Sequence, residues 1–140
     1  DINLIVQPQA QIVKHQLLNE QFITPDEINF QEIRSRLTQK RTISLLAFEL
    51  GFQLRKEIFH QIYFEATLGL GVAYIDKETE RLAQGFTFIE NLSVGFSKEW
   101  ETTEVYLGAN LGHVSNLNIQ LPNSGYNVLG FEIGYRFLIK

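Results

Sequence analysis

A histidine and a serine lie two residues apart in the segment Gly112-His113-Val114-Ser115-Asn116, near the C-terminal end of the sequence. If this segment is a β-strand, both side chains point to the same face, with their Cβ atoms about 6–7 Å apart. An imidazole at that separation can take the proton of a serine hydroxyl and so turn a weak nucleophile into an effective one. The pair therefore indicates nucleophilic acyl chemistry, provided that the surrounding elements hold it in place.

The residues around this pair alternate between apolar and small or polar types, which is typical of a β-strand. The same period-two pattern extends over residues 43–54, 61–74, 86–96, 104–115 and 129–137. Tight polar turns are expected at 55–57 and 98–103, and longer loops at 76–84 and 118–125. We therefore predict five consecutive antiparallel strands joined by hairpins.

The first 42 residues have a different pattern. Residues 2–12 alternate weakly around Pro8, which suits an edge strand or a break. Thr24-Pro25-Asp26-Glu27 has the composition of a helix start, and it precedes apolar residues at helical spacing: Phe30, Ile33 and Leu37. We expect a short surface helix or a loop between strands here, and shorter polar strands are the alternative. The chain is predicted as a single domain, with an N-terminal segment 1–42 and five barrel strands in 43–140.

One face of each predicted strand is large and apolar, and the other carries Gly, Ser, Thr, Asn, Gln and Glu. Side chains as large as Leu68, Leu107 and Phe131 at nearly every alternate position would overfill a small barrel, whereas the polar set fits its interior. Apolar residues around the outside of a closed sheet indicate hydrocarbon surroundings. We predict an all-β, antiparallel up-and-down membrane β-barrel of eight strands with a short N-terminal helix. A soluble barrel of the lipocalin type is the alternative, and it requires the apolar face to point inward.

If the apolar face points outward, the positions of the charged, aromatic and candidate site residues can also be predicted. Interior carboxylates need partners, and the expected set is Glu49, Glu65 and Glu132 with Arg136, Tyr63, Asn91 and Asn110. Aromatic residues are expected as girdles at the two interfaces, namely Phe59, Trp100 and Phe137 at the short-turn end and Tyr74, Phe86 and Tyr126 at the long-loop end. By parity, His113 and Ser115 face outward near the long loops. There they are either functional or simply polar residues at the depth of the lipid headgroups.

The composition excludes several classes of protein. The 140 residues contain no cysteine, which removes disulfide scaffolds, thiolate metal sites and cysteine nucleophiles. A net charge of −4 argues against nucleic acid as a partner. His15 and His60 are isolated in sequence, so no metal site and no cofactor are expected. The chain begins at Asp1, and we expect a protein of the bacterial outer membrane whose signal peptide has been removed.

Beside this interpretation, the sequence resembles the outer-membrane lipid A 3-O-deacylases of the PagL type, whose penultimate strand ends in a His-x-Ser-Asn motif followed by a Pro-Asn-x-Gly loop. The matching segments are His113-Val114-Ser115-Asn116 and Pro122-Asn123-Ser124-Gly125, in the same order and at the same spacing. The similarity covers roughly residues 43–137. It implies an eight-stranded barrel that acts as a serine esterase on lipid A.

The resemblance also implies roles for individual residues. Ser115 would be the nucleophile and His113 the general base, while Asn116 and the backbone N–H of Asn118 would form the oxyanion hole. The acidic third member of the best-known relatives aligns with Asn127, which can orient an imidazole but cannot stabilise imidazolium by charge. Glu90, predicted to lie level with His113 on the neighbouring strand, is a second candidate for this role or else an interface carboxylate.

Lipid A, or lipopolysaccharide, in the outer membrane is the expected partner. The competing hypothesis is a non-catalytic barrel of the same fold, acting as a structural or accessory subunit that kept the motif and lost the acid. A homodimer or a membrane complex is the expected assembly.

Overall fold

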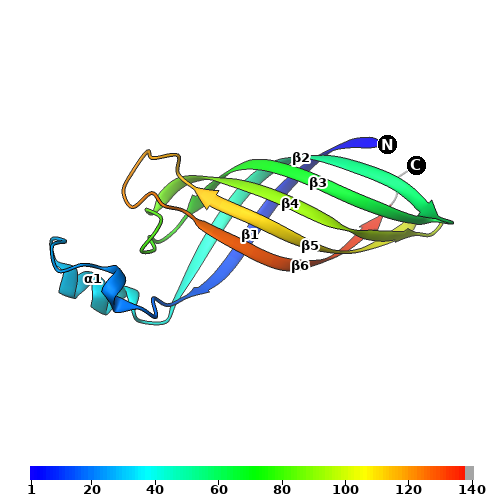
Figure 1. Cartoon of the computed structure of the whole chain (residues 1–140). Helices are drawn as coiled ribbons and strands as arrows, with labels where there is room; N and C mark the ends of the chain where they lie inside the picture. The colour runs from blue at the N-terminus through cyan, green and yellow to red at the C-terminus, as the bar shows by residue number, and fades with distance from the viewer. Residues whose placement is uncertain (138–140) are drawn as a thin grey trace.

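The computed structural model describes residues 1–137 as a curled antiparallel sheet with a small helical appendage (Figure 1). The strands are β1 (Ile2–His15), β2 (Arg41–Phe59), β3 (Ile62–Ile75), β4 (Gly85–Glu99), β5 (Thr103–Ser115) and β6 (Tyr126–Phe137). A 3₁₀ turn, η1 (Glu20–Phe22), and the helix α1 (Phe30–Leu37) lie between β1 and β2. Each strand pairs with the next along the chain, so the order in the sheet is β1-β2-β3-β4-β5-β6. The five strands predicted in 43–140 are confirmed.

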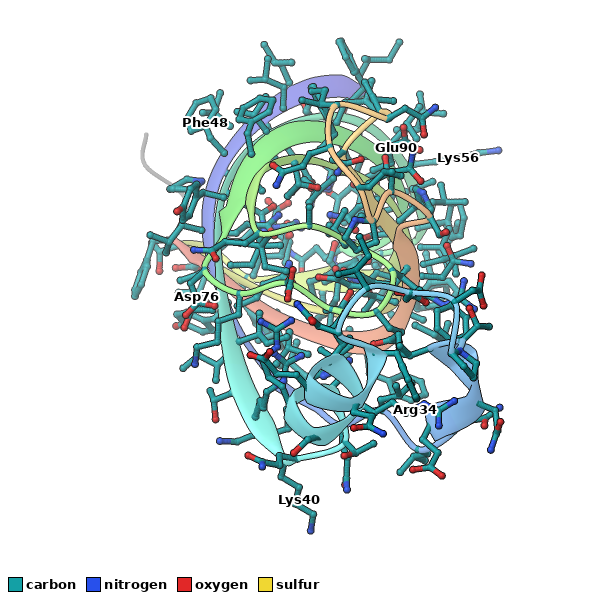
Figure 2. The ribbon with its side chains drawn as sticks, turned by 90° about the vertical axis from the view of Figure 1, so that its left-hand side faces the viewer. Arg34, Lys40, Phe48, Lys56, Asp76 and Glu90 are labelled. Atoms are coloured by element: carbon teal, nitrogen blue, oxygen red, sulfur yellow. The ribbon has the colours of Figure 1, made fainter. Side chains whose placement is uncertain are left out.

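Viewed from the end that carries the long loops, the sheet curls around a centre filled by side chains (Figure 2). Within residues 1–137 no ladder joins β1 to β6, so the sheet is a half-barrel with two free edges. The prediction of eight strands is wrong for this part of the chain, which forms six. The N-terminal 42 residues contribute β1 and the first residues of β2, while the segment between them forms η1, α1 and their loops.

The helix predicted in the N-terminal segment exists but begins later than predicted. Thr24 and Glu27 form a turn, in which the N–H of Glu27 donates to the carbonyl of Thr24 at 3.1 Å. A hydrogen bond from Thr24 holds the pKa of Asp26 below its usual value. The helix starts at Phe30, after Asn29 adopts a left-handed backbone with φ of 61°. Its apolar residues pack, as their spacing predicts, in a small cluster of Leu17, Ile23, Phe30, Ile33 and Leu37.

The turn predicted at residues 55–57 is also misplaced, because β2 continues to Phe59 and the chain turns at His60 and Gln61. Charged residues usually lie in turns because water solvates them there, so the prediction fails where other protein groups replace the water. Arg55 instead points into the half-barrel, where it lies 2.8 Å from Glu99 and 2.5 Å from Glu104. Partners on other strands therefore keep this charged segment extended.

The apolar rows face outward and the polar rows face inward, as predicted. Leu68, Leu107 and Phe131 are 52%, 56% and 95% exposed, whereas Glu65 is 1% exposed. The lipocalin-type alternative required the opposite orientation and is wrong. Among the described residues, no helix is long and apolar enough to cross a membrane.

The interior carboxylates are partnered across the half-barrel. Arg136 on β6 pairs with Glu65 on β3 at 2.8 Å and also with Glu104 on β5. Glu49 accepts hydrogen bonds from Gln9 and Asn91, and Glu132 accepts one from Ser93 at 3.0 Å. Three of these contacts, Arg136–Glu65, Asn91–Glu49 and Ser93–Glu132, connect strands that are not neighbours in the sheet, so they stabilise its curvature.

The interior becomes apolar at the long-loop end. There a buried cluster joins four strands to the 76–84 loop, and its members are Ile43, Leu45, Ala73, Ile75, Leu82, Ile89 and Val114. Tyr126 packs against this cluster, so its predicted place in an outer aromatic girdle is wrong. The loop residue Leu82 is fully buried, which anchors the loops beside the end of β5.

Candidate active site

His113 and Ser115 lie at the C-terminal end of β5, and Ser115 is the last residue of the strand. The intervening Val114 belongs to the interior cluster. Because side chains alternate along a strand, His113 and Ser115 share the outward face with Leu107 and Leu111. Both are partly exposed. The structure therefore carries the pair on the apolar outer surface, next to the long loops.

The orientation of His113 is set by the neighbouring strand. His113 and Asn127 are register partners on β5 and β6, and Nδ1 of the imidazole lies 2.7 Å from Oδ1 of Asn127. An amide oxygen only accepts hydrogen bonds, so Nδ1 must carry the proton. In the neutral imidazole Nε2 is then unprotonated and is the atom free to act as a base.

The other side of the imidazole lies against Gly125, the last residue of the loop before β6. A Cβ atom at this position would lie 3.1 Å from both Cε1 and Nε2 of His113, and 2.5 Å from the carbonyl oxygen of Val114. Gly125 also has φ of 65°, a conformation that side chains disfavour. Only glycine therefore allows the loop to approach the ring so closely.

The backbone of Ser115 is fixed from β4. The hydroxyl of Thr87, a fully buried residue, donates a hydrogen bond to the carbonyl oxygen of Ser115. Among the hydrogen bonds within residues 1–137, none joins Ser115 Oγ to His113. Such bonds are often loose without substrate and shorten in the reacting complex.

Asn116 and Asn118 occupy the tight turn that follows Ser115. Asn116 is buried, and its Nδ2 donates to the carbonyl oxygen of Gln120 at 2.6 Å, so this side chain holds the loop. Leu117 and Asn118 both adopt left-handed backbone conformations, with φ of 50° and 63°. Within the described chain, the N–H of Asn118 donates to no protein acceptor, which leaves it available to an incoming group.

The loop 116–125 is in turn held by the loop 76–84. The N–H of Gly125 donates to the carbonyl of Arg81 at 3.0 Å, and the N–H of Ala83 donates to the carbonyl of Pro122 at 2.8 Å. Leu82 and Asn123 form an isolated bridge between the two loops. Buried Leu82 thus fixes the loop that carries Gly125, and through it the position of the imidazole.

These features can be compared with known proteins. The family model for lipid A 3-O-deacylase (PagL) matches residues 27–136. The chain belongs to the PagL family. The match begins earlier than the resemblance noted from the motifs and includes α1 and the start of β2. No curated protein and no solved structure matches the chain.

Within this PagL-family chain, the structure brings Glu90 close to the pair but does not connect it. Glu90 and His113 are register partners on β4 and β5, as the sequence predicted. Glu90 is exposed and points away from the interior (Figure 2). No hydrogen bond of the described residues joins its carboxylate to His113, whereas Asn127 makes one. Of the two candidates for orienting the imidazole, Asn127 is the one in contact.

Three residues of the site were not identified as candidates from the sequence: Thr87, Gly125 and Leu82. Gly125 was visible only as the last residue of the Pro-Asn-x-Gly segment. Thr87 is one of several small polar residues on the inner face of β4, and nothing in its spacing marks it out. Leu82 is a single apolar residue in a polar loop, which is a weak signal of burial. The remaining histidines lie elsewhere, with His15 paired to Glu80 at 2.7 Å and His60 in the turn after β2.

Proposed function

We propose that this protein is an outer-membrane esterase that removes the acyl chain at the 3-position of lipid A. The supporting observation is the hydrogen bond between His113 Nδ1 and Asn127 Oδ1, because it leaves Nε2 as a base on the same outward face as Ser115. PagL-family membership supplies the substrate class and the outer-membrane setting. The exposed apolar rows suit a substrate that arrives laterally from the acyl-chain layer.

In the proposed reaction, Ser115 Oγ attacks the ester carbonyl while Nε2 of His113 takes the hydroxyl proton. The negative charge on the carbonyl oxygen is stabilised by backbone N–H groups at the turn after β5, that of Asn118 among them. The imidazolium then gives its proton to the departing sugar oxygen, which leaves an acyl group on Ser115. Water activated by His113 cleaves this second ester, releases the fatty acid and restores the hydroxyl.

Asn127 has a limited role in this scheme. Its oxygen keeps the proton on Nδ1 and holds the ring, but it lacks the charge that would stabilise the imidazolium formed in the first step. We therefore expect a slow enzyme. The side chain of Asn116 contributes by holding the loop through Gln120, and its predicted role as an oxyanion donor would require its Nδ2 to leave that carbonyl.

The competing proposal is a non-catalytic barrel that retains the motif. It is favoured by the same absence of a carboxylate at position 127 and by the absence of a hydrogen bond between His113 and Ser115 in the described chain. The two proposals differ in whether lipid A is changed.

The test is mass spectrometry of lipid A after incubation with the full chain reconstituted in lipid vesicles. Loss of one 3-hydroxyacyl chain supports the esterase, and the Ser115→Ala variant should abolish it. Ser124→Ala is a matched control, because Ser124 is exposed in the adjacent loop and should leave activity unchanged. Unchanged lipid A with the natural chain would favour the non-catalytic barrel, whereas equal activity in Ser115→Ala would overturn Ser115 as the nucleophile.

A further inference from the structure

A group of lysines gathers on the outward face where β1 ends and β2 begins. Lys14 and Thr42 are register partners, and Nζ of Lys14 donates to Oγ1 of Thr42 at 2.7 Å. Lys77, from the loop after β3, donates through Nζ to the carbonyl oxygen of the same Thr42 at 2.8 Å. Two ammonium groups from separate segments therefore meet at one threonine, and Lys40 lies two residues before it.

Lys14, Lys40 and Thr42 border a cavity of about 520 Å³, and Lys77 reaches Thr42 from outside its lining. Its lining consists of Lys14, His15, Gln16, Lys40, Arg41 and Thr42, and it contains no carboxylate. Buried Nε of Arg41 donates to no acceptor in residues 1–137. Figure 2 shows Lys40 projecting away from the interior of the half-barrel, below the start of β2. The cavity is thus cationic and opens toward the outside.

The acidic residues nearest to this group have other partners. Asp76 accepts the N–H of Ser44 at 2.7 Å, and Glu80 is paired with His15. Glu78 forms an ion pair with Arg36. None of the ion pairs in the described chain includes Lys14, Lys40 or Lys77. Ammonium groups placed together without a carboxylate repel one another, and an anion between them would remove that repulsion.

The position of the lysines relative to the membrane surface follows from the rows of outward-facing residues on β1 and β2. On β1 the row is apolar as far as Ile12 and then reaches Lys14, while on β2 it is apolar as far as Leu46 and then reaches Ser44 and Thr42. The change occurs at matching register, since Ile12 pairs with Ser44 and Lys14 with Thr42. In a membrane protein this change marks the boundary between acyl chains and headgroups. Figure 1 shows the start of β2 and the end of β5 at the same end of the sheet.

We propose that Lys14, Lys40 and Lys77, with the hydroxyl of Thr42, bind the phosphate group of a phosphorylated lipid headgroup in the surrounding leaflet. Lysine ammonium groups bind phosphate as compact charges with several donors each, and the threonine hydroxyl adds a further donor. The site is separate from the Ser115 pair, which lies three strands away on β5. The proposal rests on the outward orientation of the apolar face of the sheet and does not require that the protein hydrolyses lipid A.

The experiment measures lipid binding by native mass spectrometry, using the full chain with Ser115→Ala in neutral detergent so that hydrolysis plays no part. The probe is phosphatidic acid, which carries a phosphate monoester, and phosphatidylcholine of the same chain length is the comparison lipid. The double variant Lys14→Gln/Lys77→Gln should weaken phosphatidic acid binding at least about tenfold, because two of the ammonium groups are lost. The matched control, Lys56→Gln/Lys98→Gln, removes the same charge at the short-turn end and should bind as the parent does.

Three outcomes would overturn the proposal. Equal binding by the double variant would show that the lysines do not hold the headgroup. Equal weakening in the control variant would reduce the effect to overall charge. Displacement of the lipid by inorganic phosphate at the same concentration would show that the site binds free phosphate and not a lipid. Because binding is read in Ser115→Ala, failure of the esterase proposal leaves this result unaffected.

Discussion

Nδ1 of His113 lies 2.7 Å from Oδ1 of Asn127, its register partner across β5 and β6. With Asn127 Oδ1 as acceptor, Nδ1 carries the proton and Nε2 is left unprotonated, on a side chain that shares the outward face of β5 with Ser115. In a serine hydrolase this orienting position is normally filled by a carboxylate, which also stabilises the imidazolium. The imidazole of His113 is therefore oriented by an amide that lacks the charge a carboxylate would supply.

The first prediction concerns this missing charge. Asn127→Asp keeps the hydrogen bond and adds the carboxylate, so kcat should rise. The increase should be smaller than the loss of about 10⁴-fold that the reverse change causes in serine proteases, because there the asparagine also sets the wrong tautomer. Asn127→Leu removes the acceptor and should lower kcat by about 10²-fold, because the base is no longer held. The measurement is the rate of fatty acid release in vesicles containing lipid A, with kcat and KM determined separately.

Ser124→Asp is the control for this series, because it adds the same charge in the neighbouring exposed loop. It should not change kcat. A change in KM alone for the Asn127 variants would mean that residue 127 affects lipid binding and does not position the histidine. A drop in kcat with Asn127→Asp would contradict the proposed role.

The second prediction concerns the close approach of the loop to the imidazole. In Gly125→Ala the new methyl group would lie 3.1 Å from Nε2 of His113 and 2.5 Å from the carbonyl oxygen of Val114, and φ of 65° would be strained as well. We expect kcat to fall by about 10²-fold as the ring is displaced. Activity is measured as above, and circular dichroism reports whether the sheet is retained.

Gly85→Ala separates the effect of backbone strain from the effect of a methyl group in contact with His113. Gly85 also has positive φ, 121°, but a Cβ atom there would meet no atom within 4 Å. This variant carries the backbone strain without the contact to His113 and should keep its activity. If both variants lose activity equally, backbone strain in the loops explains the effect and the contact with the ring does not.

The strands and their orientation could be predicted because period-two alternation is carried by many residues at once. The exposure of Phe131 and the burial of Glu65 follow from that alternation and from the size of the side chains. The strand count could not be predicted in the same way, since residues 16–40 have few alternating positions and form an appendage. Arg55 shows a further limit, because its partners Glu99 and Glu104 are distant in sequence.

In the candidate site too, features set by strand register were predictable, and features set by contacts between distant residues were not. The alignment of Glu90 with His113 follows from hairpin register and was predictable. The contact of His113 with Asn127 was one of two alternatives, and only the side-chain geometry distinguishes them. Thr87, Gly125 and Leu82 act through the backbone or through a neighbouring loop, so their residue types alone carry no signal of a role.

The third prediction concerns Glu90. Because Asn127 holds the imidazole and Glu90 makes no hydrogen bond to it in the described chain, Glu90→Gln should leave kcat within about twofold, as expected for an exposed substitution away from specific contacts. The same vesicle assay measures it. A loss as large as that of Asn127→Leu would assign the orienting role to Glu90 and would require its side chain to turn toward His113.

The fourth prediction concerns the interior ion pairs that hold the curvature of the sheet. Arg136 pairs with Glu65 and Glu104, whose side chains are 1% and 2% exposed. Arg136→Met leaves both carboxylates with Arg55 as their remaining cationic partner. Because Arg55 stays and Arg136 is 37% exposed, the free energy of unfolding should fall by about 1–3 kcal/mol, less than for a fully buried pair that loses its only partner. Adding Glu65→Gln leaves Arg55 with one buried carboxylate fewer to neutralise and should recover part of the loss. Urea unfolding in lipid vesicles measures the change, with the exposed Lys56→Met as control.

If Arg136→Met unfolds at the same urea concentration as the natural chain, the curvature is held by the apolar cluster at the long-loop end instead, since that cluster also joins β2, β3, β4 and β5.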